Sequence, residues 1–373
     1  MKKLLLATGI FPPDIGGPAT YCKRFADEFS RKGIQVEVVT YGFPSATVPY
    51  RIFFTSRQWP SGLRQLFYAI ALIRAAKGAD GIISFDSLGA GLPALIVGKI
   101  RRKKVIMRLG GDFLWEKYVE KGLGTQTMRE FYEKGTYKKY FGGVRRLIAF
   151  VLRRTDTIVF TTEFQRSLFI PHYRLDPDKT AVLGNVFYPE APAVRSKNEA
   201  FFLWAGRLIR LKNIPFLLDV FQKVRMKYAS TKPLLRLIGE GPEKEAIREM
   251  ILQKGLEGSV KLEPALSQKE LQKLIREAYC CILPSLTEIS PNFALDCIAA
   301  GTPLVLTKET GIRDTFSELE YADPHNEEEF AEKIEALIGD KDHYLAYSKK
   351  VKDISYMKTW EQAADEYLKF FYA

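Results

Sequence analysis

The sequence holds little cysteine or histidine. Among its 373 residues there are 4 cysteines and 3 histidines. No two cysteines have the C-x-x-C spacing of a metal or redox site, so a zinc site has little support. Cys280 and Cys281 are neighbours in an apolar run, which is typical of reduced thiols that pack as small apolar side chains. A reducing cytosol is the simplest compartment for such a chain.

The sequence also lacks a long apolar run. No stretch approaches the roughly 18–20 apolar residues that are needed to span a bilayer. The first residues, MKKLLLATGIFPP, hold a short apolar run that is followed by an amphipathic helical pattern. This order predicts a first strand rather than a signal peptide. We therefore expect a cytoplasmic protein.

The loop after the first predicted strand matches neither G-x-G-x-x-G nor a Walker motif. It does contain the pair Gly16-Gly17. A strand, a glycine-containing loop and a helix in this order let backbone amides approach an anion, because glycine has no Cβ to block it. Gly16 and Gly17 are therefore candidates for anion binding, although a glycine pair alone is weak evidence.

The chain is long enough for two domains. One hydrophobic core rarely serves 373 residues, and a hydrophobic content of 46% is ample for two packed cores. Predicted strands alternate with predicted helices, which favours parallel α/β domains. Residues 186–200 contain two prolines and little periodicity, so they predict the linker. The predicted strands include 2–9, 35–40, 80–84, 104–109, 155–162 and 201–206, and the predicted helices include 61–77, 88–100, 214–228, 326–338 and 341–351.

Positive charge is concentrated in the first half of the chain. Residues 1–190 hold 30 Lys and Arg against 16 Asp and Glu, a balance of +14. Residues 191–373 hold 26 against 28, a balance of −2, and the two halves sum to +12. Such asymmetry indicates an anionic partner for the first half, either a lipid surface, a lipid phosphate or nucleic acid. A basic surface that serves only solubility is the alternative.

Aromatic and basic side chains interleave over residues 113–154. Aromatic bodies with cationic neighbours suit a lipid headgroup interface. They would also suit stacking on single-stranded nucleic acid. A helix pair that packs on a sheet and leaves a solvated basic face is the third interpretation. The aromatic members are Trp115, Tyr118, Phe131, Tyr132, Tyr137, Tyr140 and Phe141.

The richest stretch for function is 283–312, LPSLTEISPNFALDCIAAGTPLVLTKETGI. Residues 280–283 predict a buried strand, and 303–307 predict the next one. Between them, Ser290-Pro291 predicts the start of a helix, with Ser290 as N-cap and Pro291 at the first helical position. A helix that begins at the carboxyl ends of parallel strands offers its amides and dipole to phosphate. Two acids, Glu288 and Asp296, bracket this helix start.

A second anion-binding pattern follows the strand 201–206. Arg207 and Lys212 lie in a Gly-Arg-x4-Lys arrangement at the end of this strand. Both side chains can reach one pyrophosphate from there, Arg as a bidentate fork and Lys as a point charge. The order is then LLRLIGEGPEKEAI, VKLEPALSQKEL and the Glu288/Asp296 stretch, and four such pieces in this order are hard to obtain by chance.

This series resembles the retaining GT-B glycosyltransferases, and most closely the large family numbered four. Glu288, seven residues, an acid and then Ala-Gly-x-Pro-Leu-Val are similar to the E-x7-E motif of that family. The second acid here is Asp296 in place of Glu, which shortens its reach by one methylene. The Gly-Phe-Gly that usually follows the first Glu is replaced by 289–292, Ile-Ser-Pro-Asn.

The resemblance implies roles for residues of the second half. Glu288 would face the donor sugar and Asp296 would hold the ribose hydroxyls. Arg207 and Lys212 would bind the diphosphate, so that no metal is expected. The nucleotide-binding set is completed by Gly239, Leu266, Ser290, Pro291, Asn292 and Phe293.

Residues of the first half receive roles by the same resemblance. Gly16 and Gly17 lie in a loop like the P-x-x-G-G loop that faces the donor phosphate and the acceptor. Asp112 follows the strand 104–109, where the family often has a His-Asp pair. Gly111 stands at about the position of the His, so Asp112 is a candidate catalytic residue or a helix N-cap.

The implied fold is GT-B, with two Rossmann-like α/β domains. The first domain would comprise 1–185 and a C-terminal crossing helix in 356–373, and the second would comprise 186–355. The implied reaction moves a hexose-type sugar from a UDP- or GDP-type nucleotide sugar to a lipid-linked, glycan or other acceptor hydroxyl. The enzyme would serve cell-envelope polysaccharide synthesis without a cofactor and without a nucleic-acid partner, with peripheral contact at the inner face of the membrane.

Three alternative functions remain open from the sequence. A nucleotide-sugar 2-epimerase shares the GT-B architecture. A non-catalytic nucleic-acid-binding protein would use the basic first half, although the phosphate-binding motifs lie in the half without excess charge. An inactive GT-B partner subunit is suggested by Asp296 and by the absent His.

Overall fold

The structure is a computed structural model that describes residues 2–14, 16–43, 47–186, 201–354, 356 and 358–372. Contacts divide the chain into two units. The first comprises Met1–Leu114, Thr136–Val186 and Lys358–Ala373, and the second comprises Trp115–Gly135 and Phe187–Met357. Apart from Val186, the predicted linker lies outside the described residues.

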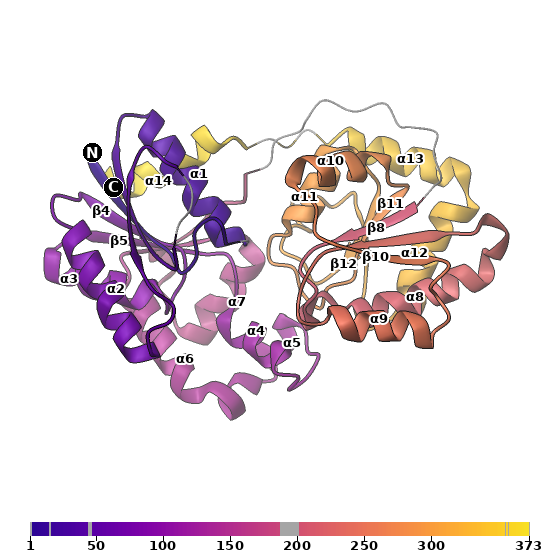
Figure 1. Ribbon diagram of the computed structural model, residues 1–373, viewed down its shortest axis with the longest axis horizontal. Helices are drawn as coiled ribbons and strands as arrows, with labels where there is room; N and C mark the ends of the chain where they lie inside the picture. The colour runs from indigo at the N-terminus through magenta and orange to yellow at the C-terminus, as the bar shows by residue number, and fades with distance from the viewer. Residues whose placement is uncertain are drawn as a thin grey trace. The chain divides into compact units, whose positions relative to one another are not determined.

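A 7-stranded sheet forms the centre of the first unit, in the order β3-β2-β1-β4-β5-β6-β7 (Figure 1). Every neighbouring pair in it is parallel. Parallel order follows from the helix that the chain inserts between most successive strands. The strands are β1 (Lys3–Ala7), β2 (Gln35–Tyr41), β3 (Arg51–Thr55), β4 (Gly81–Ser84), β5 (Lys104–Leu109), β6 (Thr157–Phe160) and β7 (Thr180–Val182).

Helices cover both faces of this sheet. Along β1, Leu4 and Leu6 pack into the cluster that contains the helices α1 and α14, whereas Leu5 and Ala7 pack into the cluster under α2 and α3. This alternation is what the period of two in a strand requires when both faces are buried. The helices are α1 (Gly17–Arg31), α2 (Ser61–Ala75), α3 (Gly91–Arg101), α6 (Thr136–Arg154), α7 (Glu163–Tyr173) and α14 (Trp360–Tyr372), and α4 (Phe113–Glu120) begins in this unit.

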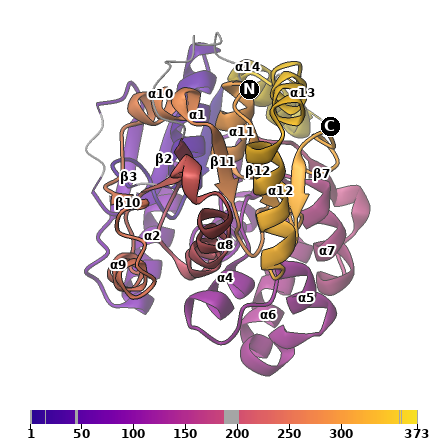
Figure 2. The same cartoon turned by 90° about the vertical axis from the view of Figure 1, so that its right-hand side faces the viewer.

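The C-terminal helix α14 packs against α1, the first helix of the chain (Figures 1 and 2). The ring of Phe25 in α1 lies 5.6 Å from that of Trp360 and 4.8 Å from that of Tyr367. Lys32 adds an ion pair of 2.8 Å with Asp365. The two ends of the sequence therefore share the core of the first unit.

The second unit contains a 6-stranded parallel sheet in the order β10-β9-β8-β11-β12-β13. Its apolar residues form one core cluster, in which Cys280, Cys281 and Cys297 are buried. All four cysteines are free thiols, as the sequence predicts. The strands are β8 (Phe201–Ala205), β9 (Leu234–Ile238), β10 (Val260–Glu263), β11 (Cys280–Leu283), β12 (Leu304–Thr307) and β13 (Glu320–Ala322).

Seven helices of the described chain belong wholly to the second unit. Five of them follow its strands, α13 follows α12, and α5 comes from the inserted segment Trp115–Gly135. The predicted division placed all of 1–185 in one domain, so the structure differs from it over this segment. The helices are α5 (Met128–Glu133), α8 (Ile214–Lys227), α9 (Lys244–Gln253), α10 (Gln268–Glu277), α11 (Asn292–Ala299), α12 (Glu327–Gly339) and α13 (Lys341–Lys352). Short 3-10 turns lie at Arg210–Lys212 and Ala229–Thr231 in this unit and at Pro177–Lys179 in the first.

The sequence pattern misses four strands. β7, β10 and β13 have only three or four residues, too few for a period of two to stand out. β3 lies at the edge of its sheet and alternates poorly, because Ile52 and Phe53 are half-buried and Phe54 is exposed. Edge strands need not present a continuous apolar face to a core.

The aromatic side chains of 113–154 are mostly core residues. Trp115, Tyr118, Phe131, Tyr132 and Tyr137 are at most 6% exposed. The segment forms three helices, α4, α5 and α6, rather than a pair. Buried rings cannot present an aromatic face to a lipid or a base, so the packing interpretation holds for them and the other two do not.

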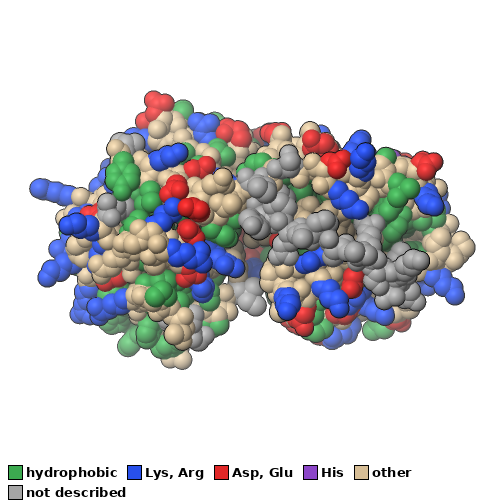
Figure 3. Space-filling model, turned by 90° about the horizontal axis from the view of Figure 1, so that it is seen from above, with side chains coloured by type: hydrophobic (Ala, Val, Ile, Leu, Met, Phe, Trp, Pro, Cys, Tyr) green, Lys and Arg blue, Asp and Glu red, His purple; other side chains and the backbone are tan. Residues whose placement is uncertain are grey.

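Charged residues of both signs are interspersed on the surface. Figure 3 shows Asp and Glu side chains among the Lys and Arg on the face that it draws. The excess positive charge of the first half therefore does not form one uninterrupted patch on that face. Within the described part of the chain, no helix is both long enough and apolar enough to cross a membrane.

Candidate active site

The strand order of the second sheet reverses between β8 and β11. From β8 the chain moves through β9 to β10, and from β11 it moves through β12 to β13 on the other side. Ligands of open parallel sheets bind outside the carboxyl ends of the strands at such a reversal. Residues 206–213 follow β8 and residues 284–291 follow β11. These two segments are therefore where the fold predicts a ligand site.

The structure brings Lys212 and Glu288 together at this point. Lys212 Nζ lies 2.6 Å from Glu288 Oε1, and Ser285 Oγ donates a hydrogen bond of 2.6 Å to the same oxygen. The Glu288 side chain is 10% exposed and that of Lys212 is 23% exposed. A carboxylate so nearly buried needs such partners, and here it has a cation and a hydroxyl.

Backbone geometry joins the two segments. Leu286 N donates to Leu211 O at 3.0 Å. Asn213 adopts a left-handed conformation with φ 57°, which Asn tolerates better than most residues. Its Nδ2 donates to Pro284 O at 3.2 Å and to Pro324 O at 3.0 Å. The Lys212–Glu288 contact is therefore held by the main chain on both sides.

A third segment, which follows β12, supports Glu288 from the other side. Glu288 N donates to Glu309 O at 2.9 Å, and Gly311 N donates to Glu288 O at 2.9 Å. Both bonds belong to a short parallel bridge between Glu288 and Thr310. Burial raises the pKa of the Glu309 carboxyl, and the nearby Arg129 opposes that effect. The contact of residues 309–311 with Glu288 is a finding of the structure.

Arg207 and Gly239 lie at neighbouring strand ends. Arg207 is exposed, and it makes no hydrogen bond or ion pair with the described residues. Gly239 approaches the residue before Arg207 closely, since a Cβ at 239 would lie 1.9 Å from the carbonyl oxygen of Gly206. Glycine is required there because any side chain would collide with backbone.

The helix α11 starts one residue later than the sequence predicts. Pro291, and not Ser290, occupies the capping position, so Ser290 is not the N-cap and no side-chain cap bond forms. The first bond within the helix runs from Leu295 N to Pro291 O, at 3.1 Å. The amides of Asn292 and Phe293 therefore precede the helical hydrogen-bond series and lie at the positive end of the dipole.

Asp296 lies on the second turn of α11. Its Oδ2 accepts a hydrogen bond of 3.1 Å from Gln268 Nε2, at the start of α10. Leu266 lies two residues before α10 and packs, half-buried, against the core of the second unit. The structure thus places Asp296 and Leu266 near the same helix start.

The remaining predicted residues belong to the first unit. Gly16 and Gly17 follow β1, and Asp112, which is 2% exposed, directly precedes α4. The first sheet reverses between β1 and β4. Asp86, which no sequence motif indicates, follows β4 there, and its Oδ1 accepts a hydrogen bond from Ala90 N at 2.8 Å. Burial raises the pKa of the Asp86 carboxyl, although backbone hydrogen bonds oppose it.

The inserted segment Trp115–Gly135 reaches the residue next to Glu288. Met128 N, in the first turn of α5, donates a hydrogen bond of 2.9 Å to Thr287 Oγ1. Arg129 Nε lies 3.5 Å from Glu309 Oε1, and His325 Nε2 lies 3.5 Å from Glu130 Oε2. The helix start of α5 is thereby fixed on the loop that carries Glu288. No sequence signal indicates this contact, because its partners are 159 residues apart.

Replacing Thr287 with valine should loosen α5. The variant keeps the shape but removes the acceptor of the buried Met128 amide, which costs about 1–3 kcal/mol. About 1.4 kcal/mol corresponds to a tenfold change, so amide hydrogen exchange in residues 126–133 should become about tenfold faster. Thr287→Ser keeps the hydroxyl and should exchange like the unchanged protein. Equal exchange in the valine variant would show that the bond does not hold α5.

Metal ligands are not grouped in this site. Among the described residues, no three or more His, Cys, Asp or Glu side chains lie together in a way that could hold a metal ion. Besides the Glu288 carboxylate, the segments after β8 and β11 offer a ligand the cations Arg207 and Lys212 and the amides at the start of α11. That donor set suits an anion such as a diphosphate.

Two protein-family models match the chain. The model of glycosyltransferase family 4 matches residues 15–190, and the model of glycosyl transferases group 1 matches residues 190–354. Together they extend over most of both units.

Curated relatives are distant, and some match over nearly the full length of the chain. An uncharacterized glycosyltransferase of Haemophilus influenzae is 23% identical over 370 residues, which cover 95% of this chain and 96% of the relative. A D-inositol 3-phosphate glycosyltransferase of Stackebrandtia nassauensis is 25% identical over 240 residues, which cover 58% of this chain and 54% of the relative.

Solved structures share the fold over the whole chain. HepE of Anabaena in complex with UDP and glucose has a TM-score of 0.76 at 16% identity and covers 99% of both chains. Sucrose-phosphate synthase of Thermosynechococcus elongatus has a TM-score of 0.75 at 15% identity and covers 100% of this chain and 98% of its own. The parallel sheets, the matched family models and these neighbours agree, and the chain belongs to the family 4-like glycosyltransferases of GT-B fold.

Proposed function

We propose that this glycosyltransferase uses a nucleoside diphosphate sugar, of UDP or GDP type, and transfers a hexose-type sugar with retention at the anomeric carbon. The observation that carries the proposal is the contact of Lys212 with Glu288 at the reversal point of the second sheet. A cation held there can bind the diphosphate of such a donor, and a carboxylate held there can accept hydrogen bonds from its sugar.

The proposed roles follow from the charge of each group. Arg207, Lys212 and the amides of Asn292 and Phe293 stabilise the negative charge that grows on the leaving diphosphate. Glu288 accepts hydrogen bonds from the donor sugar. These cations do the work that a metal does in other transferases, so the proposed reaction needs no metal and no cofactor.

The remaining residues hold the nucleotide or act toward the acceptor. Asp296 accepts hydrogen bonds from the ribose hydroxyls, and Gly239, Leu266, Ser290 and Pro291 shape the nucleotide site. In the first unit, Gly16, Gly17 and Asp112 are proposed to act toward the acceptor. The proposed division of labour thus gives the donor to the second domain and the acceptor to the first.

The proposed step breaks the bond between the anomeric carbon and the diphosphate oxygen. A bond from the anomeric carbon to the acceptor oxygen forms on the same face of the sugar. The acceptor hydroxyl loses its proton to the leaving diphosphate, so no histidine is required as a base. Lys212 and Arg207 lower the energy of the charged diphosphate at the moment when the bond breaks.

The acceptor is proposed to be a lipid-linked molecule or a glycan, of the kind used for cell-envelope polysaccharide. The first half of the chain carries a charge balance of +14, which would attract an anionic acceptor or an anionic membrane surface. The enzyme would then work at the cytoplasmic face of a membrane.

Thermal unfolding in the presence of UDP, GDP, ADP, dTDP and CMP tests the donor site. A ligand at 100 times its Kd stabilises the folded state by about 2.7 kcal/mol, so one diphosphate should raise the Tm clearly. Arg207→Ala should abolish that rise, because it removes a cation that has no other partner in the described chain.

Arg210→Ala is the matched control for this test. Arg210 lies three residues from Arg207 but contacts Glu243, with Nε 3.4 Å from Oε1. The control variant should keep the rise in Tm. No rise with any nucleotide in the unchanged protein would contradict the donor site and favour an inactive partner subunit.

A further inference from the structure

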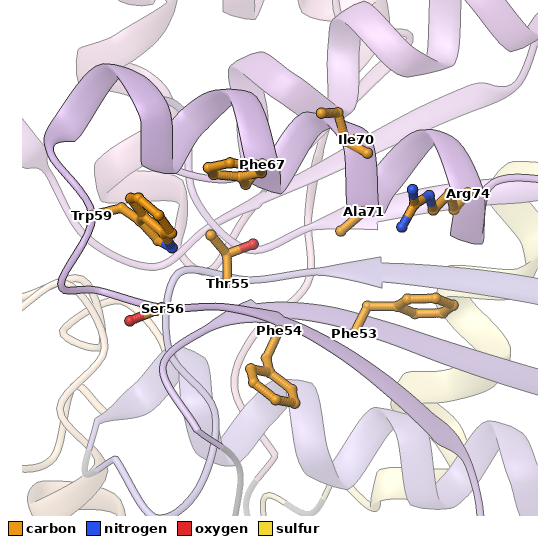
Figure 4. Close-up of a pocket in the computed structure, with 9 residues that line it drawn as sticks. All are labelled: Phe53, Phe54, Thr55, Ser56, Trp59, Phe67, Ile70, Ala71 and Arg74. Carbon is orange, nitrogen blue, oxygen red and sulfur yellow. The ribbon is translucent and has the colours of Figure 1, made fainter.

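A hollow of about 400 Å³ opens between β3 and α2 in the first unit. Figure 4 shows side chains of α2 on one side and those of β3 with the following loop on the other, with Trp59 and Arg74 at opposite ends. Apolar and aromatic groups dominate the lining. The lining residues are Phe53, Phe54, Thr55, Ser56, Trp59, Phe67, Ile70, Ala71 and Arg74.

Large apolar side chains are exposed in and around this hollow. Phe54 is 49% exposed, Trp59 is 47% exposed and Phe67 is 40% exposed. The rings of Trp59 and Phe67 lie 5.2 Å apart, so they form one aromatic surface rather than two isolated groups. Contiguous exposed apolar surface of this kind marks a site for a membrane or for another molecule.

The helix α2 is apolar on both of its faces. Tyr68 and Leu72 are fully buried toward the sheet. On the outer face, Leu63 and Leu66 are exposed together with Phe67. A helix that packs on one side only does not need apolar residues on the other. The apolar outer face of α2 therefore indicates contact with a second apolar environment.

The chain segment that forms the hollow is basic. Residues 38–79 contain five basic residues, Arg51, Arg57, Arg64, Arg74 and Lys77, and no Asp or Glu. Arg57 contacts Asp14 from an earlier loop, with Nη1 3.0 Å from Oδ1. The other four form no ion pair with any described carboxylate. An exposed aromatic surface with unpaired cations beside it is complementary to anionic lipid and repels an acidic protein surface.

We propose that this hollow and the outer face of α2 dock on an anionic lipid bilayer. Trp59 and Phe67 would insert at the level where aromatic rings are enriched in membrane interfaces, and Arg74 would lie against a lipid phosphate. The first-half segment that contacts lipid is thus 53–74 and not the aromatic-rich 113–154, whose rings are mostly buried. Docking rests on this surface alone and does not depend on the proposed transfer reaction.

Emission from Trp59 provides a direct test on the full chain. Of the four tryptophans, Trp115 and Trp204 are 2% and 1% exposed and Trp360 is half-buried, whereas Trp59 is 47% exposed, so a change of solvent at the surface affects Trp59 most. Phosphatidylglycerol vesicles should shift the emission to the blue, and phosphatidylcholine vesicles should not. Trp59→Phe should remove the shift while the protein still sediments with the vesicles. At about 1 M salt, where the Debye length is about 3 Å, binding should weaken.

Co-sedimentation of variants tests whether the hollow is the surface. Trp59→Ser with Phe67→Ser should reduce the bound fraction about tenfold. The matched control is Met226→Ser with Leu252→Ser, which removes two apolar side chains of 77% and 55% exposure from the second unit. The control should bind as the unchanged protein does. Arg74→Gln should weaken binding about fivefold, as expected for one cation near an anionic surface.

Three outcomes would overturn the proposal. The first is an unchanged Trp59 emission with phosphatidylglycerol vesicles, and the second is equal binding by the serine variant and its control. The third is a dimer of the unchanged protein that Trp59→Ser with Phe67→Ser converts to a monomer, because the hollow would then be covered by a second copy of this chain. Far-ultraviolet circular dichroism of each variant should match the unchanged protein, since the altered side chains are half exposed.

Discussion

Replacing Lys212 with methionine should lower kcat by about 10²–10³. The substitution keeps most of the side-chain volume and removes the charge that, in the proposed reaction, stabilises the leaving diphosphate. It also removes the cation 2.6 Å from Glu288, although Ser285 still donates to that carboxylate. Steady-state transfer to a suitable acceptor, measured at saturating donor, gives the change in kcat.

Lys333→Met is the matched control for this change. Lys333 Nζ also lies 2.6 Å from a glutamate oxygen, Oε2 of Glu320, but the pair is on α12 and β13. Loss of an exposed ion pair of this kind costs about 0–1 kcal/mol of stability and should leave kcat unchanged. If both variants retain more than about a third of the activity, Lys212 does not act on the reacting atoms and the proposed mechanism is wrong.

The sequence predicted the alternation of strands and helices because the central strands are buried on both faces. In such strands apolar residues run without interruption, as in Cys280–Leu283, and they stand out against the amphipathic helices between them. The same alternation predicted where Lys212 and Glu288 lie, since both follow the carboxyl end of a predicted strand. Their contact then follows from topology, because β8 and β11 are neighbours and loops after parallel neighbours meet at one edge.

What the sequence did not predict depends on contacts between distant segments. Thr287 looks like any polar loop residue until Met128 N is found 2.9 Å from its hydroxyl. The rings of Trp115 and Phe131 were compatible with an exposed face, because helical periodicity shows that one face is apolar but not what covers it. Conversely, the sequence around Trp59 and Phe67 contains no motif, so it did not indicate a binding surface. Only the structure shows that the two rings are exposed and lie side by side.

The helix start at Asn292 illustrates a local error. Ser-Pro is a strong statistical signal for a cap followed by the first helical residue, and it predicted Ser290 as the cap. In the structure the chain around Glu288 is held in a parallel bridge with Thr310, so Ser290 and Pro291 complete the loop before the helix begins. Tertiary hydrogen bonds have overridden the local preference, which is expected where a loop carries the residues of the proposed site.

A methyl group at Gly239 should destabilise the second unit by about 1–3 kcal/mol. The Cβ of Gly239→Ala would lie 1.9 Å from Gly206 O, and both residues are held by neighbouring strands. Gly206 N donates to Ile238 O and Gly239 N donates to Glu263 O, each at 3.0 Å, so neither can retreat without loss of a hydrogen bond. A unit of this size loses about 2–4 °C in Tm for each kcal/mol, which calorimetry resolves.

The collision should also affect the proposed donor site, because Gly206 directly precedes Arg207. Movement of that carbonyl turns the main chain that carries the guanidinium, so the rise in Tm caused by a nucleoside diphosphate should shrink as well. Gly258→Ala is the control, since a Cβ at 258 meets nothing within 4 Å; it should change neither the Tm nor the response to nucleotide. If Gly239→Ala has the same Tm as Gly258→Ala, the two strand ends separate easily. The site would then be less rigid than preorganised stabilisation of a diphosphate requires.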